Sequence, residues 1–233
     1  MLKPGKRGTI AAALICAGSL VWAGAAQALT IEADPGAETS GFKPGAYNMA
    51  QGEPVTFLNK DTGVRHDVTS RGRIGGGPLF LSPTFTGTAP GVTRFVNGTQ
   101  YLTQGSYAFI CNVHPLGMTG TLKVTGAGTP VPRPRIVVKV LSRKIKRVAN
   151  TRRARVRVRA VTDSNNVSLA LKLRNLRLGG KAGINLKAGQ KRVLTVRLSK
   201  RAKRTLSRRK RARVKLIGSV RFGPRATASK LLK

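Results

Sequence analysis

The chain has 233 residues, of which 44 are Lys or Arg and 7 are Asp or Glu, so its formal net charge is +37. This charge is uneven, because residues 29–128 carry a net +1 and residues 129–233 carry a net +33 with Asp163 as their single acid. One evenly mixed globule is therefore excluded, and the length suits one or two domains. Disorder throughout is not expected, because 40% of the residues are hydrophobic.

The N-terminus has the three parts of a secretory signal peptide. Lys3, Lys6 and Arg7 form a basic start, residues 9–26 are apolar, and residues 26–28 read Ala-Gln-Ala, a small-x-small cleavage pattern. We predict a signal peptide over residues 1–28, with an uncleaved anchor helix as the alternative. Export makes a secreted, periplasmic or cell-wall-associated location the expectation. No apolar stretch long enough to span a membrane follows residue 28.

Residues 29–125 show the spacing of short strands divided by Gly- and Pro-containing turns. Such spacing, without a long helical period, predicts an antiparallel β-sandwich. Residues 71–91 are rich in Gly and Pro and predict a long loop. The predicted strands are 55–58, 66–69, 93–96, 106–111 and 120–124.

Residues 126–134 contain three prolines and predict an extended, fairly stiff linker. After it, apolar and basic residues alternate with a period of two, which is typical of half-buried strands. Turns are predicted at 163–166 and 187–189, and one short helix at 199–210 with Ser199 as its N-cap. Residues 135–233 are thus expected to form a second small β-sandwich with cationic outer faces. Its predicted strands are 136–140, 153–159, 169–173, 194–198 and 214–216.

Cleavage after residue 28 leaves Cys111 as the single cysteine of the mature chain. An internal disulfide is then impossible, and an exported free thiol is prone to oxidation unless a metal occupies it. His114 and Met118 lie within eight positions of this cysteine, and the other histidine, His66, lies 45 residues upstream. Residues 111–118 thus hold three of the five Cys, His and Met residues of the mature chain.

One thiolate and two imidazoles with a weak axial thioether are the ligands of a mononuclear electron-transfer copper site. Zinc with an open fourth position is the alternative, although no carboxylate base sits in the Cys111 loop. With two histidines in all, the chain lacks the further His clusters of a multicopper oxidase or nitrite reductase. It also lacks the Cys-x-x-Cys-His of haem attachment, and the spacing of Cys111 and His114 is not that of a nucleophile and its base.

Residues 29–125 resemble the cupredoxins of the plastocyanin and amicyanin type. The resemblance is carried by Asn59-x-Asp61, His66-x-Val68, Tyr107-x-Phe109-x-Cys111-x-x-His114-Pro115 and Met118-x-Gly120. It implies a Greek-key β-sandwich that shuttles single electrons, and it implies the ring edge of His114, beside Pro115 and Leu116, as the electron port. The implied ligands of one type 1 copper ion are His66, Cys111 and His114, with Met118 as the axial ligand.

Two positions depart from that family. Plastocyanins usually have four residues between the loop His and Met and amicyanins have two, whereas this chain has three between His114 and Met118. Asp67 stands where an asparagine often follows the first ligand, which can alter how the ligand loop is tuned.

Residues 135–233 resemble the Arg- and Lys-rich immunoglobulin-like C-terminal modules of secreted actinobacterial proteins, through the run 198–204 that follows an alternating strand. A net +33 predicts association with anionic cell-wall polymers or membrane surfaces. A passive solubilising module is the alternative. Binding to nucleic acid is not expected, because Phe222 is the single aromatic residue of this region.

The sequence therefore predicts a secreted blue-copper protein that is not an enzyme. Copper would cycle between Cu(I) and Cu(II), and redox partner proteins would be its partners. The basic region would hold the protein near an anionic surface or steer acidic redox partners. The alternatives are copper storage or delivery, and cell-surface binding with a structural metal site.

Overall fold

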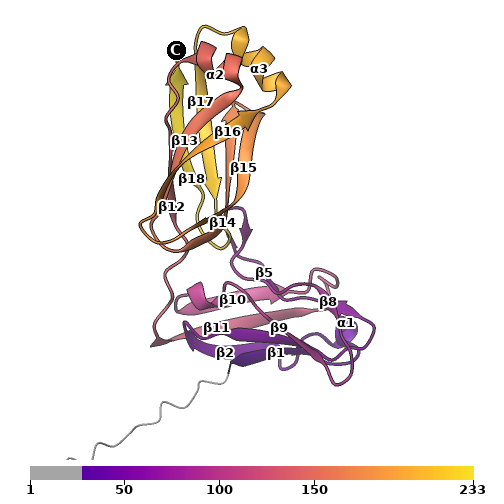
Figure 1. Ribbon diagram of the computed structural model, residues 1–233. Helices are drawn as coiled ribbons and strands as arrows, with labels where there is room; N and C mark the ends of the chain where they lie inside the picture. Colours follow the sequence, from indigo (N-terminus) through magenta and orange to yellow (C-terminus); the bar gives the residue numbers. More distant parts are fainter. Residues whose placement is uncertain (1–27) are drawn as a thin grey trace, which may run out of the picture.

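The computed structural model describes residues 28–233. The predicted signal peptide therefore lies outside the described residues, apart from Ala28. Two separate hydrophobic cores are present, one built from residues between Ile31 and Val124 and the other from residues between Ile136 and Leu232. We call the surrounding parts the first unit (residues 28–128) and the second unit (residues 135–233); they form the lower and upper bodies in Figure 1. Both consist mainly of β-strands, so the predicted all-β class is confirmed.

Two larger sheets enclose the core of the first unit, and two further sheets have two short strands each. The three-stranded sheet has the order β1-β3-β9, and the four-stranded sheet has the order β2-β11-β10-β5. The strands are β1 (Leu29–Ala33), β2 (Ala46–Gln51), β3 (Val55–Asn59), β5 (Thr69–Ser70), β9 (Val92–Phe95), β10 (Gly105–Ile110) and β11 (Thr119–Gly128). Short elements connect them: α1 (Ala37–Ser40), the 3-10 helix η1 (Thr99–Tyr101), and the strands β4 (Arg65–His66), β6 (Arg73–Ile74), β7 (Gly77–Pro78) and β8 (Phe85–Thr86).

Aromatic side chains fill the centre of the first unit. Phe109 is fully buried, and its ring centroid lies 5.1 Å from that of Phe42, 6.1 Å from that of Tyr47 and 6.4 Å from that of Phe80. Gly120 pairs with Phe109 across β10 and β11, and a Cβ there would lie 2.4 Å from the Phe109 ring. The glycine therefore gives the ring its space, and strand β10 is held rigidly up to the residue that precedes Cys111.

The second unit is one continuous seven-stranded sheet of order β12-β13-β16-β15-β14-β17-β18. It curls into a near-barrel, because its two edge strands β12 and β18 contact each other. The seven strands are therefore not divided into two separately hydrogen-bonded sheets. The strands are β12 (Ile136–Val140), β13 (Arg153–Ala160), β14 (Ser164–Leu173), β15 (Leu176–Leu186), β16 (Lys191–Leu198), β17 (Ala212–Ser219) and β18 (Ala226–Leu232).

The second unit has two helices where one was predicted. The predicted one is α3 (Lys200–Ser207), and the Ser199 side chain accepts a hydrogen bond from the Ala202 N–H, so the N-cap prediction is confirmed. The other is α2 (Ile145–Thr151), which buries Ile145, Val148 and Ala149 in the core of the second unit, where it contacts α3 and β13. Its single apolar stripe spans only five residues among basic ones, which is too short to give a helical period in the sequence.

Three further expectations differ from the structure. The predicted strand 66–69 is broken, because β4 pairs with β8 while β5 pairs with β10. The predicted loop 71–91 contains the β6–β7 hairpin and β8. The predicted turn 163–166 opens strand β14 instead, where Asn166 has a φ of 54° beside a register shift. Apart from the local β6–β7 hairpin, these differences depend on pairing partners that are remote in sequence.

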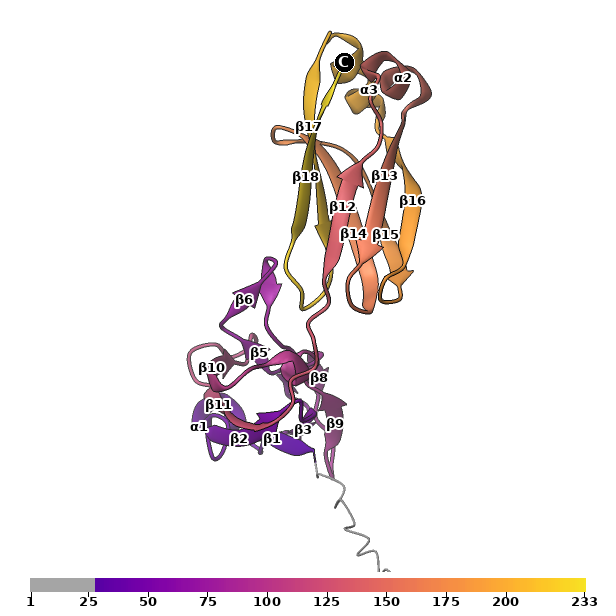
Figure 2. The ribbon, with the colours of Figure 1, turned by 90° about the vertical axis from the view of Figure 1, so that its left-hand side faces the viewer.

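The two units contact each other at one end of the second unit. Phe222 packs on Tyr101 with ring centroids 6.3 Å apart, and its carbonyl accepts a hydrogen bond from Arg133 of the predicted linker. The β6–β7 hairpin reaches toward the second unit (Figure 2), and a Cβ at Gly75 would lie 2.4 Å from the Gly223 carbonyl oxygen. Helices α2 and α3 lie at the opposite end, away from the first unit (Figure 1). Among residues 28–233, none of the helices is both long and apolar enough to cross a membrane.

Candidate metal centre

The loop between β10 and β11 carries three of the four candidate ligands. Cys111 directly follows β10, and its N–H donates a hydrogen bond of 3.0 Å to the Met118 carbonyl. The Met118 N–H in turn donates to the His114 carbonyl at 3.0 Å. These bonds close the neck of the loop where two antiparallel strands meet. A Cβ at Gly117 would lie 2.3 Å from the Glu38 carbonyl oxygen, so the loop also packs closely against α1.

His66 reaches the same loop from the other side of the sandwich. It ends β4 and pairs with Phe85 of β8. The turn before it is ordered by Asn59, whose side-chain amide donates to the Val64 and Phe85 carbonyls and whose side-chain oxygen accepts from the Asp61 N–H. This turn therefore presents Asp61 and His66 together.

The structure brings His66, Cys111 and His114 into one cluster. The Cys111 Sγ lies 3.8 Å from the His66 Nδ1 and 3.9 Å from the His114 Nδ1, and the two nitrogens are 3.2 Å apart. The point equidistant from the three atoms in their plane lies about 2.1 Å from each. Metal–nitrogen and metal–sulfur bonds are about 2.0–2.3 Å long, so the three donors fit one ion.

Met118 is the fourth candidate. Its side chain is fully buried in the core of the first unit, and its backbone bonds on both sides hold it at the end of the loop. Its role as axial ligand stays a prediction.

The protonation of the cluster favours metal binding at the sulfur. Burial by itself raises the pKa of the Cys111 thiol, but the contacts with His66 and the Asp67 N–H outweigh it, so this pKa lies below its usual value. Burial lowers the pKa of His66, but Cys111 and Asp61 raise it by more. The thiolate, the form that binds metals, is thus stabilised.

Asp61 orients His66 through its outer nitrogen. The His66 Nε2 lies 2.9 Å from the Asp61 Oδ2, and both side chains are buried. Burial raises the pKa of Asp61, but the contacts with His66, Glu38 and the Gly36 backbone together outweigh it and hold this pKa below its ordinary value. A carboxylate on the far nitrogen fixes the ring and leaves Nδ1 as the metal-binding atom. Glu38 lies beside this pair, within 4.8 Å.

Asp67 stabilises the start of the Cys111 loop through hydrogen bonds. Its carboxylate accepts hydrogen bonds from the Asn112 N–H at 2.9 Å and from the Thr84 hydroxyl at 2.9 Å. The Asn112 side-chain amide also donates to it at 3.2 Å. The aspartate that departs from the family pattern therefore buttresses the residue after Cys111. Asp61 belonged to the quoted motif, but Glu38, Thr84 and Asn112 were missed, because nothing in their local sequence spacing points to His66 or Cys111.

One edge of the cluster is open to solvent. His66 and Cys111 are fully buried, whereas His114 is partly exposed. Around it, Leu116 is 98% exposed and Val113 is 45% exposed. An exposed leucine beside a partly exposed imidazole gives this edge an apolar rim.

No protein-family model matches the sequence, and no curated protein matches it. Among solved structures, a purple cupredoxin from Nitrosopumilus maritimus is 25% identical with a TM-score of 0.34, and the match covers 42% of this chain and 99% of that one. A reduced mutant of amicyanin is 20% identical with a TM-score of 0.33, covering 43% and 84%. An oxidised amicyanin mutant is 18% identical with a TM-score of 0.33, covering 44% and 87%.

Removing the Asp61 carboxylate is expected to weaken metal binding. The Asp61→Ala variant leaves the His66 Nε2 without its 2.9 Å partner, and the loss of such an outer partner typically costs about 10- to 100-fold in metal affinity. The affinity is measured by competition with a chelator. Asp34→Ala is the matched control, because Asp34 instead faces Lys60, and its affinity should stay unchanged. Equal affinities of the two variants would show that Asp61 does not support the site.

Proposed function

We propose that the chain is an exported single-copper electron-transfer protein, with residues 29–125 as its copper domain, 126–134 as a linker and 135–233 as a basic domain. The observation that carries the proposal is the cluster of one buried thiol and two imidazole Nδ1 atoms spaced for a single ion. One sulfur and two nitrogens suit copper in both oxidation states. When bound, copper supplies a one-electron couple between Cu(I) and Cu(II).

The residues of the chain have distinct tasks in this function. Cys111 provides the thiolate, and its burial keeps water from the sulfur. Asp61 keeps His66 in one orientation, and the short loop keeps His114 and Met118 near Cys111. Such rigid positioning keeps the reorganisation between oxidation states small. The partly exposed ring of His114 and the exposed Leu116 offer an apolar contact for a redox partner, which suits the small and transient interfaces of electron transfer.

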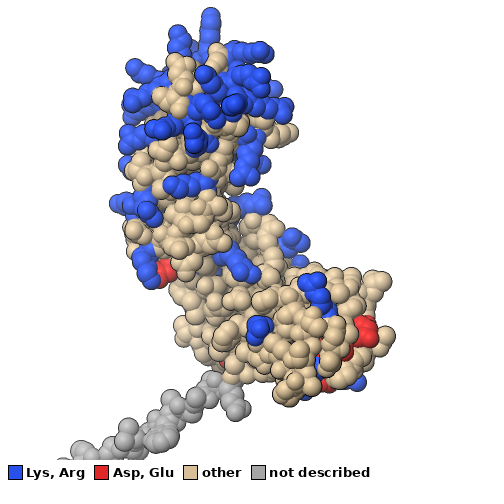
Figure 3. Space-filling view, turned by 45° about the vertical axis from the view of Figure 1, so that its right-hand side comes forward, with Lys and Arg blue, Asp and Glu red and all other residues tan. Residues whose placement is uncertain are grey.

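The basic domain supports a second part of the proposal, association with an anionic cell surface. Lys and Arg side chains cover the second unit and are densest around the end that carries α2 and α3 (Figure 3). That end lies away from the first unit (Figure 1), so attachment there leaves the His114 edge free. The same charge would also steer acidic redox partners toward the protein.

A visible spectrum tests the copper function. The chain with one equivalent of Cu(II) is expected to show an intense band in the red that ascorbate bleaches and air restores. Tight zinc binding without such a band would favour a hydrolytic or structural metal site instead. Rapid release of copper to a chelator after reduction would favour copper storage or delivery.

Met118 is expected to tune the site rather than to form it. The Met118→Leu variant should keep the red band but have a higher reduction potential. Without the thioether donor, Cu(II) is stabilised less relative to Cu(I). Cyclic voltammetry measures the potential. Met49→Leu is the matched control, since Met49 is buried in the same core on β2 and should change neither property. If Met118→Leu also changes neither, Met118 is not the axial ligand.

Surface association should depend on the basic domain. With a protease site placed after Gly128, cleavage is expected to release the first unit from sedimenting anionic liposomes or cell walls, while the second unit stays bound. The separate hydrophobic cores support folding of each part after cleavage. Co-sedimentation of the released first unit would contradict the assignment of surface binding to residues 135–233.

A further inference from the structure

The second unit has a groove of about 700 Å³ between α2 and the outer face of the sheet. Its walls come from the connection before α2, from one side of α2, and from β13 and β16. Four arginines and one lysine line it, together with three hydroxyl side chains and two apolar residues. The lining residues are Leu141, Ser142, Arg143, Lys144, Arg147, Val148, Thr151, Arg153, Arg155 and Thr195.

The charges in this groove have no partner of opposite sign within the described chain. None of the ion pairs among residues 28–233 involves any of its five cations. Asp163, the single acid of this unit, bonds to the Ala188 N–H at 2.7 Å and to Lys187 at 3.4 Å instead. All five cationic residues are exposed, so their donors are free for an external anion.

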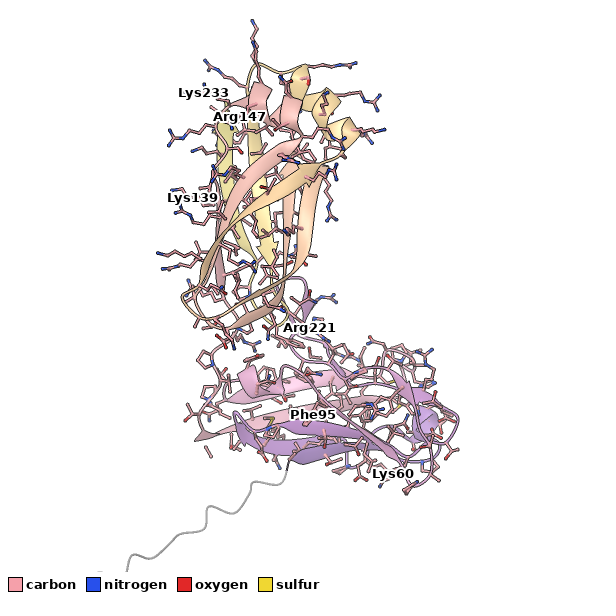
Figure 4. All side chains as sticks on the ribbon, viewed as in Figure 1. Lys60, Phe95, Lys139, Arg147, Arg221 and Lys233 are labelled. Atoms are coloured by element: carbon pink, nitrogen blue, oxygen red, sulfur yellow. The ribbon has the colours of Figure 1, made fainter. Side chains whose placement is uncertain are left out.

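Hydrogen bonds order the groove before any ligand arrives. The Ser142 hydroxyl accepts from the Arg155 N–H at 2.8 Å, and the Leu141 N–H donates to the Arg155 carbonyl at 2.9 Å. At the other side of the connection, the Ile145 N–H donates to the Lys233 carbonyl at 2.7 Å. Figure 4 shows Arg147 and Lys233 at this end of the molecule, with Lys139 further along the same edge. The backbone that carries the cations is therefore held in place by hydrogen bonds before a ligand binds.

We infer that this groove binds a linear polymer of polyol phosphates, with successive phosphodiesters held by Arg147, Arg153 and Arg155. Five positive charges call for a ligand with several negative ones, and guanidinium forks match phosphate oxygens. Alternate residues of a strand, such as Arg153 and Arg155, lie about 6.7 Å apart. That separation suits phosphates bridged by three carbon atoms and is too long for directly linked phosphates.

Composition favours a polyol phosphate over a nucleic acid. Single-stranded nucleic acids gain much of their affinity from bases stacked on aromatic side chains. The groove has none, and the single aromatic residue of the second unit, Phe222, packs on Tyr101 at the opposite end. The inference rests on the proposed surface association, and it is independent of the copper site.

The test uses the full chain after signal removal and three probes with equal numbers of charges. They are deacylated poly(glycerol phosphate), oligodeoxythymidine and polygalacturonate. We expect poly(glycerol phosphate) to bind most tightly. The double variant R147Q/R155Q should weaken this binding by about 10- to 100-fold or more, and should make the slope of log affinity against log salt shallower by about 1.4. The variant R147K/R155K keeps the charge but loses the guanidinium forks. Its affinity for poly(glycerol phosphate) should lie between those of the unmodified chain and R147Q/R155Q.

The matched control is R177Q/R213Q, which removes the same charge from exposed positions on β15 and β17 outside the groove. It should bind almost as the unmodified chain does, and thermal unfolding checks that both double variants are folded. Equal weakening in both would overturn the groove while leaving surface association by diffuse charge. Tighter binding of oligodeoxythymidine or polygalacturonate would overturn the ligand class. Failure of the unmodified chain to bind any of the three probes would overturn both the groove as a binding site and the surface association. The red copper band would still report separately on electron transfer.

Discussion

The Cys111→Ser variant is expected to lose the red absorption band entirely. That band requires charge transfer from a thiolate, and Cys111 is the single cysteine after residue 28. Its Sγ lies within 3.9 Å of both imidazole nitrogens, so no other sulfur can replace it at the same place. The fold should persist, because a serine hydroxyl can take up the contact that the sulfur makes with the Asp67 N–H.

The control for this prediction uses the three tyrosines, Tyr47, Tyr101 and Tyr107, which all lie in the first unit. Their near-UV circular dichroism should match that of the unmodified chain, so that a lost band reports on the site and not on unfolding. Any metal that the variant holds through His66 and His114 should give only a weak, pale spectrum. An intense red band in a folded Cys111→Ser variant would contradict a thiolate–copper site.

The Phe109→Ala variant is expected to lower the free energy of unfolding of the first unit by about 3–5 kcal/mol, as is typical when a buried phenylalanine is truncated. Phe109 is fully buried and contacts three other aromatic rings. It also lies two residues before Cys111, so the cavity would loosen the strand that ends at the site. Denaturant titration followed by tyrosine circular dichroism measures the change.

Phe95→Ala is the matched control for this prediction. Phe95 is 64% exposed on β9 (Figure 4), and its truncation should change the unfolding free energy by no more than about 0.5 kcal/mol. The second unit contains neither Tyr nor Trp, so the tyrosine signal isolates the first unit. Similar losses in the two variants would show that the aromatic cluster around Phe109 does not dominate the stability of this core.

The strands of the second unit were predicted well because each side of its sheet has its own chemistry. In β13 the arginines at 153, 155, 157 and 159 are exposed and the residues between them are buried. A period of two that separates charge from apolar side chains can be read directly from the sequence. The β15 and β18 strands were missed, since they carry Gly, Ala and Ser in place of a clean alternation.

The first unit was harder to predict where strands are short. β4, β5 and β8 have two residues each, and what defines them is their hydrogen-bonded partners, which are remote in sequence. The break between His66 and Thr69 lets Asp67 reach Asn112 and Thr84 while His66 faces Cys111. No local pattern specifies such a change of partner.

The sequence by itself determined the uneven charge, the all-β class and the set of sulfur and imidazole side chains, because composition, period and short spacing are properties of the chain alone. Tertiary structure decided the features that require residues far apart in the sequence to come into contact. It brought His66 to Cys111 across 45 residues, placed Asp61 on the outer nitrogen of His66, and set Asp67 behind the ligand loop. The five cations of the groove are close in sequence, within residues 143–155, and the folding of their connection, helix and strand decides that they line one groove.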